Sequence, residues 1–169
     1  MNAEDLRALQ APLKESYKAD PAAARVTLRA SGTLGEGLSC RLETGRALIE
    51  AGLHPATGGS GAQACSGDML LQALVACAGV TLNAVATAIG FELRGGTVTA
   101  EGDLDFRGTL GVDREAPVGF SAIRLRFDLD TPEPQDRIDT LTKLAERYCV
   151  VLQTLTVPPA IALQVAAHD

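Results

Sequence analysis

A stretch without charge in the middle of the chain constrains the fold more than any other feature. Residues 69–89 contain no Asp, Glu, Lys or Arg, and Gly90 follows them. At about 1.5 Å per residue, this stretch predicts one helix roughly 30 Å long, which is the width of a small domain or of the hydrocarbon core of a bilayer. The helix must therefore run through the centre of a compact domain or cross a membrane.

The residues within and around this stretch favour the first alternative. Gln72, Thr81 and Asn83 are polar, no Lys or Arg flanks the stretch, and strand patterns lie on both sides of it. We therefore predict a helix over residues 66–89, apolar on all sides and buried in a soluble core. Ser66 is its expected N-cap and Gly90 its left-handed C-terminal residue. Its many Ala and Gly residues indicate close packing against sheets or against a second copy of the helix.

Apolar and polar residues alternate on both sides of this helix, as they do in strands with one buried face. The predicted strands cover residues 25–30, 38–42, 47–51, 97–106, 123–130 and 161–165. Further helices are predicted over 135–148 and 150–155, and a short or broken one over 2–18, because Pro12 removes a backbone donor. The expected stripe of the 135–148 helix includes Leu141 and Tyr148. Strands and helices in this order indicate an α+β fold, with antiparallel sheets around the long central helix.

The length of 169 residues fits one domain. We expect residues 1–24 to form a helical lead-in and residues 25–169 a single domain.

The charge balance and the N-terminus exclude several classes of partner. The chain has 15 Lys and Arg against 21 Asp and Glu, a net charge of −6, which argues against a nucleic-acid-binding surface. The first residues lack the basic and apolar regions of a signal peptide. We therefore expect a cytoplasmic protein that binds neither nucleic acid nor membrane, with its cysteines in a reducing compartment.

Thiol chemistry is the chemistry that the residue pattern best supports. The four cysteines, at positions 40, 65, 77 and 149, lack the spacing of a zinc or iron–sulfur site, and no Gly-x-Ser-x-Gly elbow is present. No metal or cofactor is therefore expected. Cys77 lies among small residues in the middle of the long helix, and Cys149 lies at a predicted helix junction. Periodicity alone leaves open whether these two thiols react or simply fill space in the core.

Two segments resemble a known family. Residues 65–77, which follow a Gly-rich loop and end at Cys77, resemble the stretch bearing the first reactive cysteine of the OsmC/Ohr family. That family comprises osmotically inducible protein C and the organic hydroperoxide resistance proteins. Residues 145–151 resemble the stretch around its second cysteine, Cys149 here. The order of strands and helices also agrees with the family fold, so the resemblance extends from about residue 25 onward in a divergent member.

The resemblance implies a structure and an activity. It implies an intertwined homodimer wrapped around the long helices, with two active sites at the interface. It also implies the reduction of organic hydroperoxides to alcohols by Cys77 and Cys149, with a lipoyl-type dithiol as reductant. The alternative is a protein on the same scaffold that binds a small apolar or thiol-containing ligand at the dimer interface without turnover.

This chain departs from the family at the residues that activate the first cysteine. Catalytic members have an arginine in the turn of the first hairpin, which is absent from residues 32–37, and a glutamate where Gly67 stands beside Asp68. A mid-helix thiol in an apolar setting has a raised pKa, so we expect Cys77 to need a nearby cation. The candidates are Arg29, Arg41, Arg147 and His54. Cys40 is expected in the core, and Cys65 near the start of the long helix.

Overall fold

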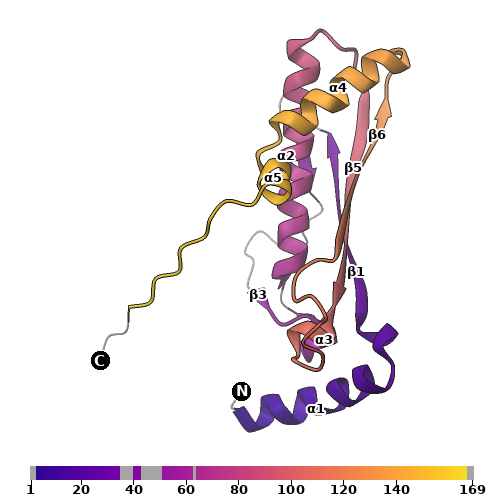
Figure 1. Ribbon diagram of the computed structural model, residues 1–169. Helices are drawn as coiled ribbons and strands as arrows, with labels where there is room; N and C mark the ends of the chain where they lie inside the picture. The colour runs from indigo at the N-terminus through magenta and orange to yellow at the C-terminus, as the bar shows by residue number, and fades with distance from the viewer. Residues whose placement is uncertain (1–2, 35–39, 43–50, 63, 167–169) are drawn as a thin grey trace.

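The computed structural model describes residues 3–34, 40–42, 51–62 and 64–166 (Figure 1). Within these ranges, side chains are described except at residues 3–7, 28–32, 34 and 40–42.

A four-stranded antiparallel sheet forms one layer of the molecule. Its strands are β1 (Arg25–Leu34), β2 (Cys40–Leu42), β5 (Gly95–Asp105) and β6 (Ala122–Asp130), in the order β2-β1-β5-β6. The register pairs Val26 with Leu104 and Val98 with Phe127. Because successive side chains of a strand point to opposite faces, the apolar residues gather on one face of the sheet. The predicted hairpin and the two later strands are confirmed, and the fold is a mixed α and β one.

The long helix α2 (Ser66–Ala88) covers the apolar face of this sheet (Figure 1). Its buried residues recur at helical spacing and form one stripe: Leu71, Leu74, Val75, Ala78, Leu82 and Ala86. These side chains pack against the buried residues Val98 and Ala100 of β5 and against Leu141 and Ala145 of α4. The N-cap is Cys65 rather than Ser66, whereas Gly90 has the predicted left-handed φ of +60°.

The prediction that α2 is buried on all sides is wrong for the single chain. Leu70 and Val80 are exposed, because the sheet and the later helices cover only one stripe of α2. By length and composition α2 could cross a membrane, and half of its most apolar window is buried within the protein. Its packing is that of a core helix with one face left open.

Two helices pack on α2 after the sheet is complete. They are α4 (Gln135–Tyr148) and α5 (Val150–Thr156), as the sequence predicts. Leu141 and Ala145 of α4 are buried against the C-terminal half of α2, but Tyr148 is exposed, contrary to its expected place in the buried stripe. Cys149 separates the two helices with an extended backbone, so α5 begins in a new direction and lies against the middle of α2 (Figure 1).

The N-terminal helix α1 (Ala3–Ala19) is unbroken, so the prediction of a short or broken helix is wrong. Pro12 is exposed, so its missing N–H leaves no unpaired group in the core. Tyr17 Oη donates to the carbonyl of Ala56 at 2.6 Å and Gln10 Nε2 donates to that of Thr57 at 3.2 Å, which anchors α1. The 3₁₀ turns η1 (Pro21–Ala24) and η2 (Pro55–Thr57) and the short helix α3 (Phe106–Thr109) complete this end. The boundary expected after residue 24 remains a prediction.

Two short strands lie beside the start of α2. Most of the strand predicted over 47–51 falls in residues 43–50, outside the described residues. Strand β3 (Ala51–Gly52) pairs with β4 (Ala64–Cys65), and this pair is parallel. The described sheets are therefore not all antiparallel.

The C-terminal segment does not form the predicted closing strand. Residues 158–166 are extended and unpaired, and Ile161, Leu163 and Val165 are 86–90% exposed. Figure 1 shows this segment leaving α5 on the side of α2 away from the four-stranded sheet. Its residues alternate between apolar and polar as predicted, but no described residue covers the apolar side chains.

Candidate redox site

The structure brings together the two cysteines that the sequence singles out. Cys77 lies in the middle of α2 and is half-buried, whereas Cys149, between α4 and α5, is 1% exposed. The two thiols are in hydrogen-bonding contact, within the core cluster that includes Leu74 and Ala78. Both are free thiols. A dithiol pair of this kind can form a disulfide when one sulfur is oxidised.

The N-terminus of α5 lies against the sulfur of Cys77. Burial by itself would raise the pKa of this thiol. The backbone N–H groups of Val151 and Val150 donate to the sulfur, as do the Cys149 thiol and the Thr81 hydroxyl, and together they lower the pKa of Cys77 below its ordinary value. The amides of a helix's first turn have no partner within the helix, and Cys149 makes no side-chain capping bond to them. They are therefore available to a thiolate.

The pKa of Cys149 shifts in the opposite direction. Burial, and then its hydrogen bond to Cys77 and the negative charge there, raises the pKa of Cys149 to about 11, although the amides of Leu152 and Val151 oppose the shift. A negative charge on one sulfur disfavours a second charge on the other. Because the pKa of Cys77 is the lower one, Cys77 ionises first and Cys149 keeps its proton. The arrangement thus favours ionisation of Cys77 over that of Cys149.

The expected raised pKa of Cys77 is therefore wrong, whereas the need for a nearby cation stays a prediction. No described arginine or lysine is among the groups that lower the pKa of Cys77. The guanidinium of Arg147 lies 5.6 Å from the ring centroid of Tyr148 instead. The side chains of Arg29, Arg41 and Cys40 lie outside the described residues. Among the described residues, the groups that lower the pKa of Cys77 are the amides of Val151 and Val150, the Cys149 thiol and the Thr81 hydroxyl.

The other polar candidates lie at the start of α2. The His54 ring stacks on Phe106 with centroids 5.0 Å apart, and its Nδ1 accepts the N–H of Ala56 at 3.0 Å. Burial raises the pKa of the Asp68 carboxyl, and the charge of His54 opposes this shift. Cys65 is half-buried at the N-cap of α2. His54 is not among the groups that shift the Cys77 pKa. In the part of the chain that the structure describes, no three His, Cys, Asp or Glu side chains form a metal-binding group.

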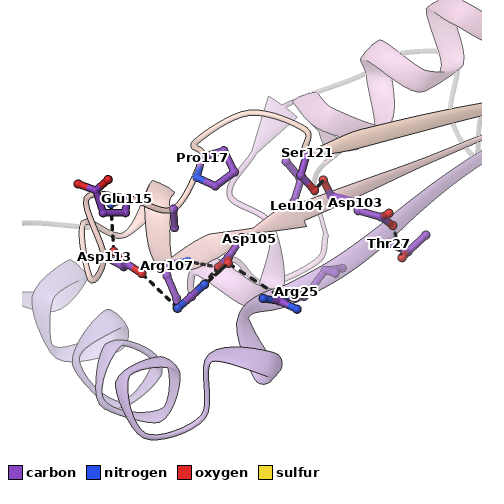
Figure 2. A pocket seen from close by; sticks show the side chains of 12 residues that line it. Arg25, Thr27, Asp103, Leu104, Asp105, Arg107, Asp113, Glu115, Pro117 and Ser121 are labelled. Carbon is purple, nitrogen blue, oxygen red and sulfur yellow. Dashed lines mark hydrogen bonds and ion pairs between the residues drawn. The ribbon is translucent and has the colours of Figure 1, made fainter.

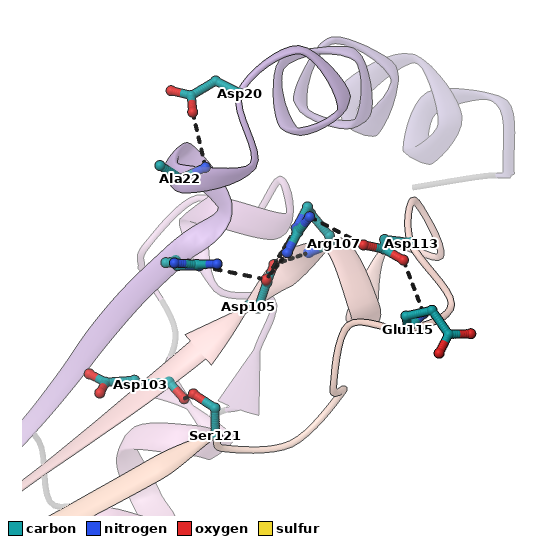
Figure 3. Close-up of polar contacts among 9 residues, drawn as sticks. Asp20, Ala22, Asp103, Asp105, Arg107, Asp113, Glu115 and Ser121 are labelled. Atoms are coloured by element: carbon teal, nitrogen blue, oxygen red, sulfur yellow. Dashed lines mark hydrogen bonds and ion pairs between the residues drawn. The ribbon is translucent and has the colours of Figure 1, made fainter.

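A cavity of about 570 Å³ lies at another place, along the ends of β1 and β5 (Figure 2). Four of its charged side chains pair with one another: Arg107 binds Asp105 at 2.6 Å and Asp113 at 3.2 Å (Figure 3), and Arg25 lies 4.0 Å from Asp105 (Figure 2). No thiol lines this cavity. We therefore assign the network to the folding of the loop after β5 and not to redox chemistry.

A long helix packed on an antiparallel sheet, with one thiol at its centre and a second at a helix junction against it, defines an α+β protein with a two-cysteine site. The chain belongs to the OsmC-like protein family, whose sequence profile matches residues 59–164. Its fold is similar to the crystal structure of an OsmC-like hydroperoxide resistance protein from Jannaschia sp. CCS1, with a TM-score of 0.64. The two are 17% identical, and the match covers 86% of this chain and 96% of the other. No match was found among curated protein sequences.

Proposed function

We propose that the protein is a thiol-dependent peroxidase that reduces organic hydroperoxides through Cys77 and Cys149. The observation that carries this proposal is the opposite shift of the two thiols, with the pKa of Cys77 lowered and that of Cys149 raised. Membership of the OsmC-like family supports it, as does the name of the similar hydroperoxide resistance protein.

The first step is attack by Cys77. Its thiolate forms a bond to the terminal oxygen of the hydroperoxide, the O–O bond breaks, and the electron pair leaves on the alkoxide. The alkoxide takes a proton and departs as the alcohol. Cys149 is suited to supply this proton, because its thiol stays protonated at neutral pH and already points its hydrogen bond at Cys77. Cys77 is left as a sulfenic acid.

The second step closes the disulfide. The Cys149 thiolate left by the first step attacks the Cys77 sulfur, the S–O bond breaks, and the leaving hydroxide takes a proton from solvent and departs as water. Because the thiols are already in contact, the step requires little movement of α5. A dithiol of the lipoyl type would then reduce the disulfide by thiol exchange. The need for such a reductant, together with the free thiols, fits the reducing cytoplasm.

We propose further that the working unit is an intertwined homodimer. The open face of α2, with Leu70 and Val80, and the exposed apolar tail around Leu163 are surfaces that a single chain leaves uncovered. A second copy would cover both.

The alternative is an OsmC-like protein that binds a small apolar or thiol-containing ligand at the dimer interface without turnover. One observation favours it: no described cation approaches Cys77 to stabilise a leaving alkoxide. The two functions differ in whether peroxide is consumed.

Intact mass after one equivalent of an alkyl hydroperoxide tests the proposal. Peroxidase activity requires the loss of two hydrogens, mapped to a Cys77–Cys149 disulfide, with one alcohol released. Cys77→Ser should abolish consumption of peroxide, and Cys149→Ser should stop the reaction at the sulfenic acid of Cys77. Cys65→Ser is the matched control and should leave the reaction intact. If both cysteines remain alkylatable and peroxide remains, the binding alternative holds instead.

A further inference from the structure

The junction between α4 and α5 interrupts a run of helical hydrogen bonds. Cys149 has a φ of −72° and a ψ of 104°, so one extended residue separates the two helices. In a continuous helix the N–H of Val150 would donate to the carbonyl of Glu146, four residues earlier. The extended residue turns α5 away from the axis of α4 (Figure 1), and the Val150 N–H donates to the sulfur of Cys77 instead. The break therefore takes the helical donor away from the Glu146 carbonyl.

A side chain takes the place of that donor. Nε2 of Gln153 donates to the Glu146 carbonyl at 2.9 Å, from seven residues further along the chain. The last carbonyls of a helix have no partner within it, so they need donors from elsewhere. The backbone N–H of Gln153 also donates to the carbonyl of Cys149 at 2.9 Å. Gln153 thus binds the chain on both sides of the break.

The Glu146 carbonyl and the Cys77 sulfur are alternative acceptors for the Val150 N–H. While Cys77 carries its proton, its sulfur is a weak acceptor, and the carbonyl is the stronger of the two. A carbonyl without a donor would therefore favour extension of α4 by one more hydrogen bond, at the expense of the contact with sulfur. The side chain of Gln153 satisfies the carbonyl and removes this competition.

We propose that Gln153 is a positioning residue, which occupies the Glu146 carbonyl and so leaves the Val150 N–H to the sulfur of Cys77. It acts through the backbone of the junction and not on the substrate. As a residue of the peroxidase site it rests on the function proposed above, but the hydrogen bonds that carry the inference do not depend on turnover. A residue that only capped α4 would stabilise the fold without changing the ionisation of Cys77.

The test is the pH dependence of Cys77 alkylation in the full chain, measured with iodoacetamide and peptide mass mapping in the absence of peroxide. Gln153→Met keeps the length of the side chain and removes the donor. The midpoint of the Cys77 curve should rise by at least about 0.5 pH unit. The rate at pH 10 should not fall, because access to the sulfur is unchanged. The variant should keep its fold, since Gln153 is exposed.

Gln135→Met is the matched control. Gln135 lies at the other end of α4 and is exposed, as Gln153 is. Its Nε2 donates to Oδ1 of Asp139 at 2.8 Å, so the substitution removes a hydrogen bond of the same length class from the same helix. The midpoint of the Cys77 curve should stay where it is in the unsubstituted chain.

A double substitution tests the competition itself. Val150→Pro removes the contested N–H, and proline suits the first position of a helix that follows an extended residue. This substitution should by itself raise the midpoint of the Cys77 curve. Gln153→Met should then raise it no further, because the Glu146 carbonyl has no Val150 N–H to capture.

The proposal is overturned if Gln153→Met moves the midpoint no more than Gln135→Met does. It is also overturned if Gln153→Met causes equal shifts with and without Val150→Pro, which would mean that Gln153 only stabilises the end of α4. Alkylation requires no peroxide, so the two proposals fail separately. A protein that shows the predicted shifts and consumes no hydroperoxide would contradict the peroxidase proposal alone.

Discussion

The thiol of Cys149 donates a hydrogen bond to the sulfur of Cys77, which helps to lower the pKa of Cys77, whereas burial and then this bond raise the pKa of Cys149. Two thiols in contact could also have had equal pKa values. They differ because α5 begins directly after Cys149, so its first amides reach Cys77 and stabilise the charge there. The position of this helix end thus favours ionisation of Cys77.

Alkylation of the two thiols should therefore differ in its dependence on pH. A thiol reacts as its thiolate, so its rate rises with pH until the group is ionised. Because the pKa of Cys77 is lowered and that of Cys149 is raised to about 11, the rate at Cys77 should approach its plateau at a lower pH than that of an ordinary thiol, while Cys149 stays slow at pH 9. Iodoacetamide labelling at several pH values, mapped by peptide mass, measures both curves. Equal curves for the two cysteines would contradict this assignment.

Removal of the Thr81 hydroxyl should raise the pKa of the Cys77 thiol. Its hydroxyl donates to Cys77 from one turn further along α2 and helps to lower the pKa. Thr81→Val keeps the shape and removes the donor, so the alkylation curve of Cys77 should move to higher pH and the rate at pH 7 should fall several-fold. Thr87→Val is the control, because the Thr87 hydroxyl donates to the carbonyl of Asn83. A rate for Thr81→Val equal to that of Thr87→Val would exclude a role for the hydroxyl.

The regular elements were predictable because each depends on a local pattern. The charge-free stretch predicts α2, the alternation predicts β5 and β6, and the acid-to-base order of residues 135–148 predicts α4. The pairing of Cys77 with Cys149 followed from the resemblance and not from any spacing. A resemblance can place two distant residues together, whereas periodicity cannot.

The amides that lower the pKa of Cys77 could not be predicted, because a backbone group leaves no mark in the sequence. The break after Cys149 was visible, but the direction of α5 depends on how it packs against α2. The prediction of a closing strand was wrong for a related reason. Alternation around Leu163 shows that the segment could join a sheet, but it does not show which strand would pair with it. At Pro12 the sequence predicts a break that the structure does not have. The helix continues because Pro12 lies on its exposed face, where a missing N–H is tolerated.

The ion pairs of Asp105 should make folding sensitive to acid. Hydrogen bonds from Arg107 hold the pKa of the Asp105 carboxyl below its ordinary value. A carboxyl with a lowered folded pKa stabilises the fold above its unfolded pKa of about 3.9, and this contribution disappears as the pH falls through the folded value. Asp105→Asn should therefore lower Tm by several degrees at pH 7 and by much less near pH 2. Thermal unfolding followed by circular dichroism at both pH values measures the difference.

Asp113→Asn is the control for that experiment. Asp113 contacts the same Arg107 at 3.2 Å but its side chain is 36% exposed, against 9% for Asp105. Water screens the exposed pair more strongly, so its loss should change Tm little at either pH. Equal losses from the two variants would show that burial of Asp105 adds nothing to the network.

The C-terminal segment should hold two chains together. Ile161, Leu163 and Val165 lie on one side of an extended segment and are 86–90% exposed, and a sheet in a second copy would bury them. The full chain should therefore sediment at twice its 17.6 kDa at micromolar concentration. Leu163→Asp places a charge on the apolar side and should shift the sedimentation mass toward that of one chain. Gln164→Asp places the same charge on the opposite side of the segment and should leave the mass unchanged. A full chain that sediments as a single copy, or equal effects of the two substitutions, would contradict docking of this segment on a partner.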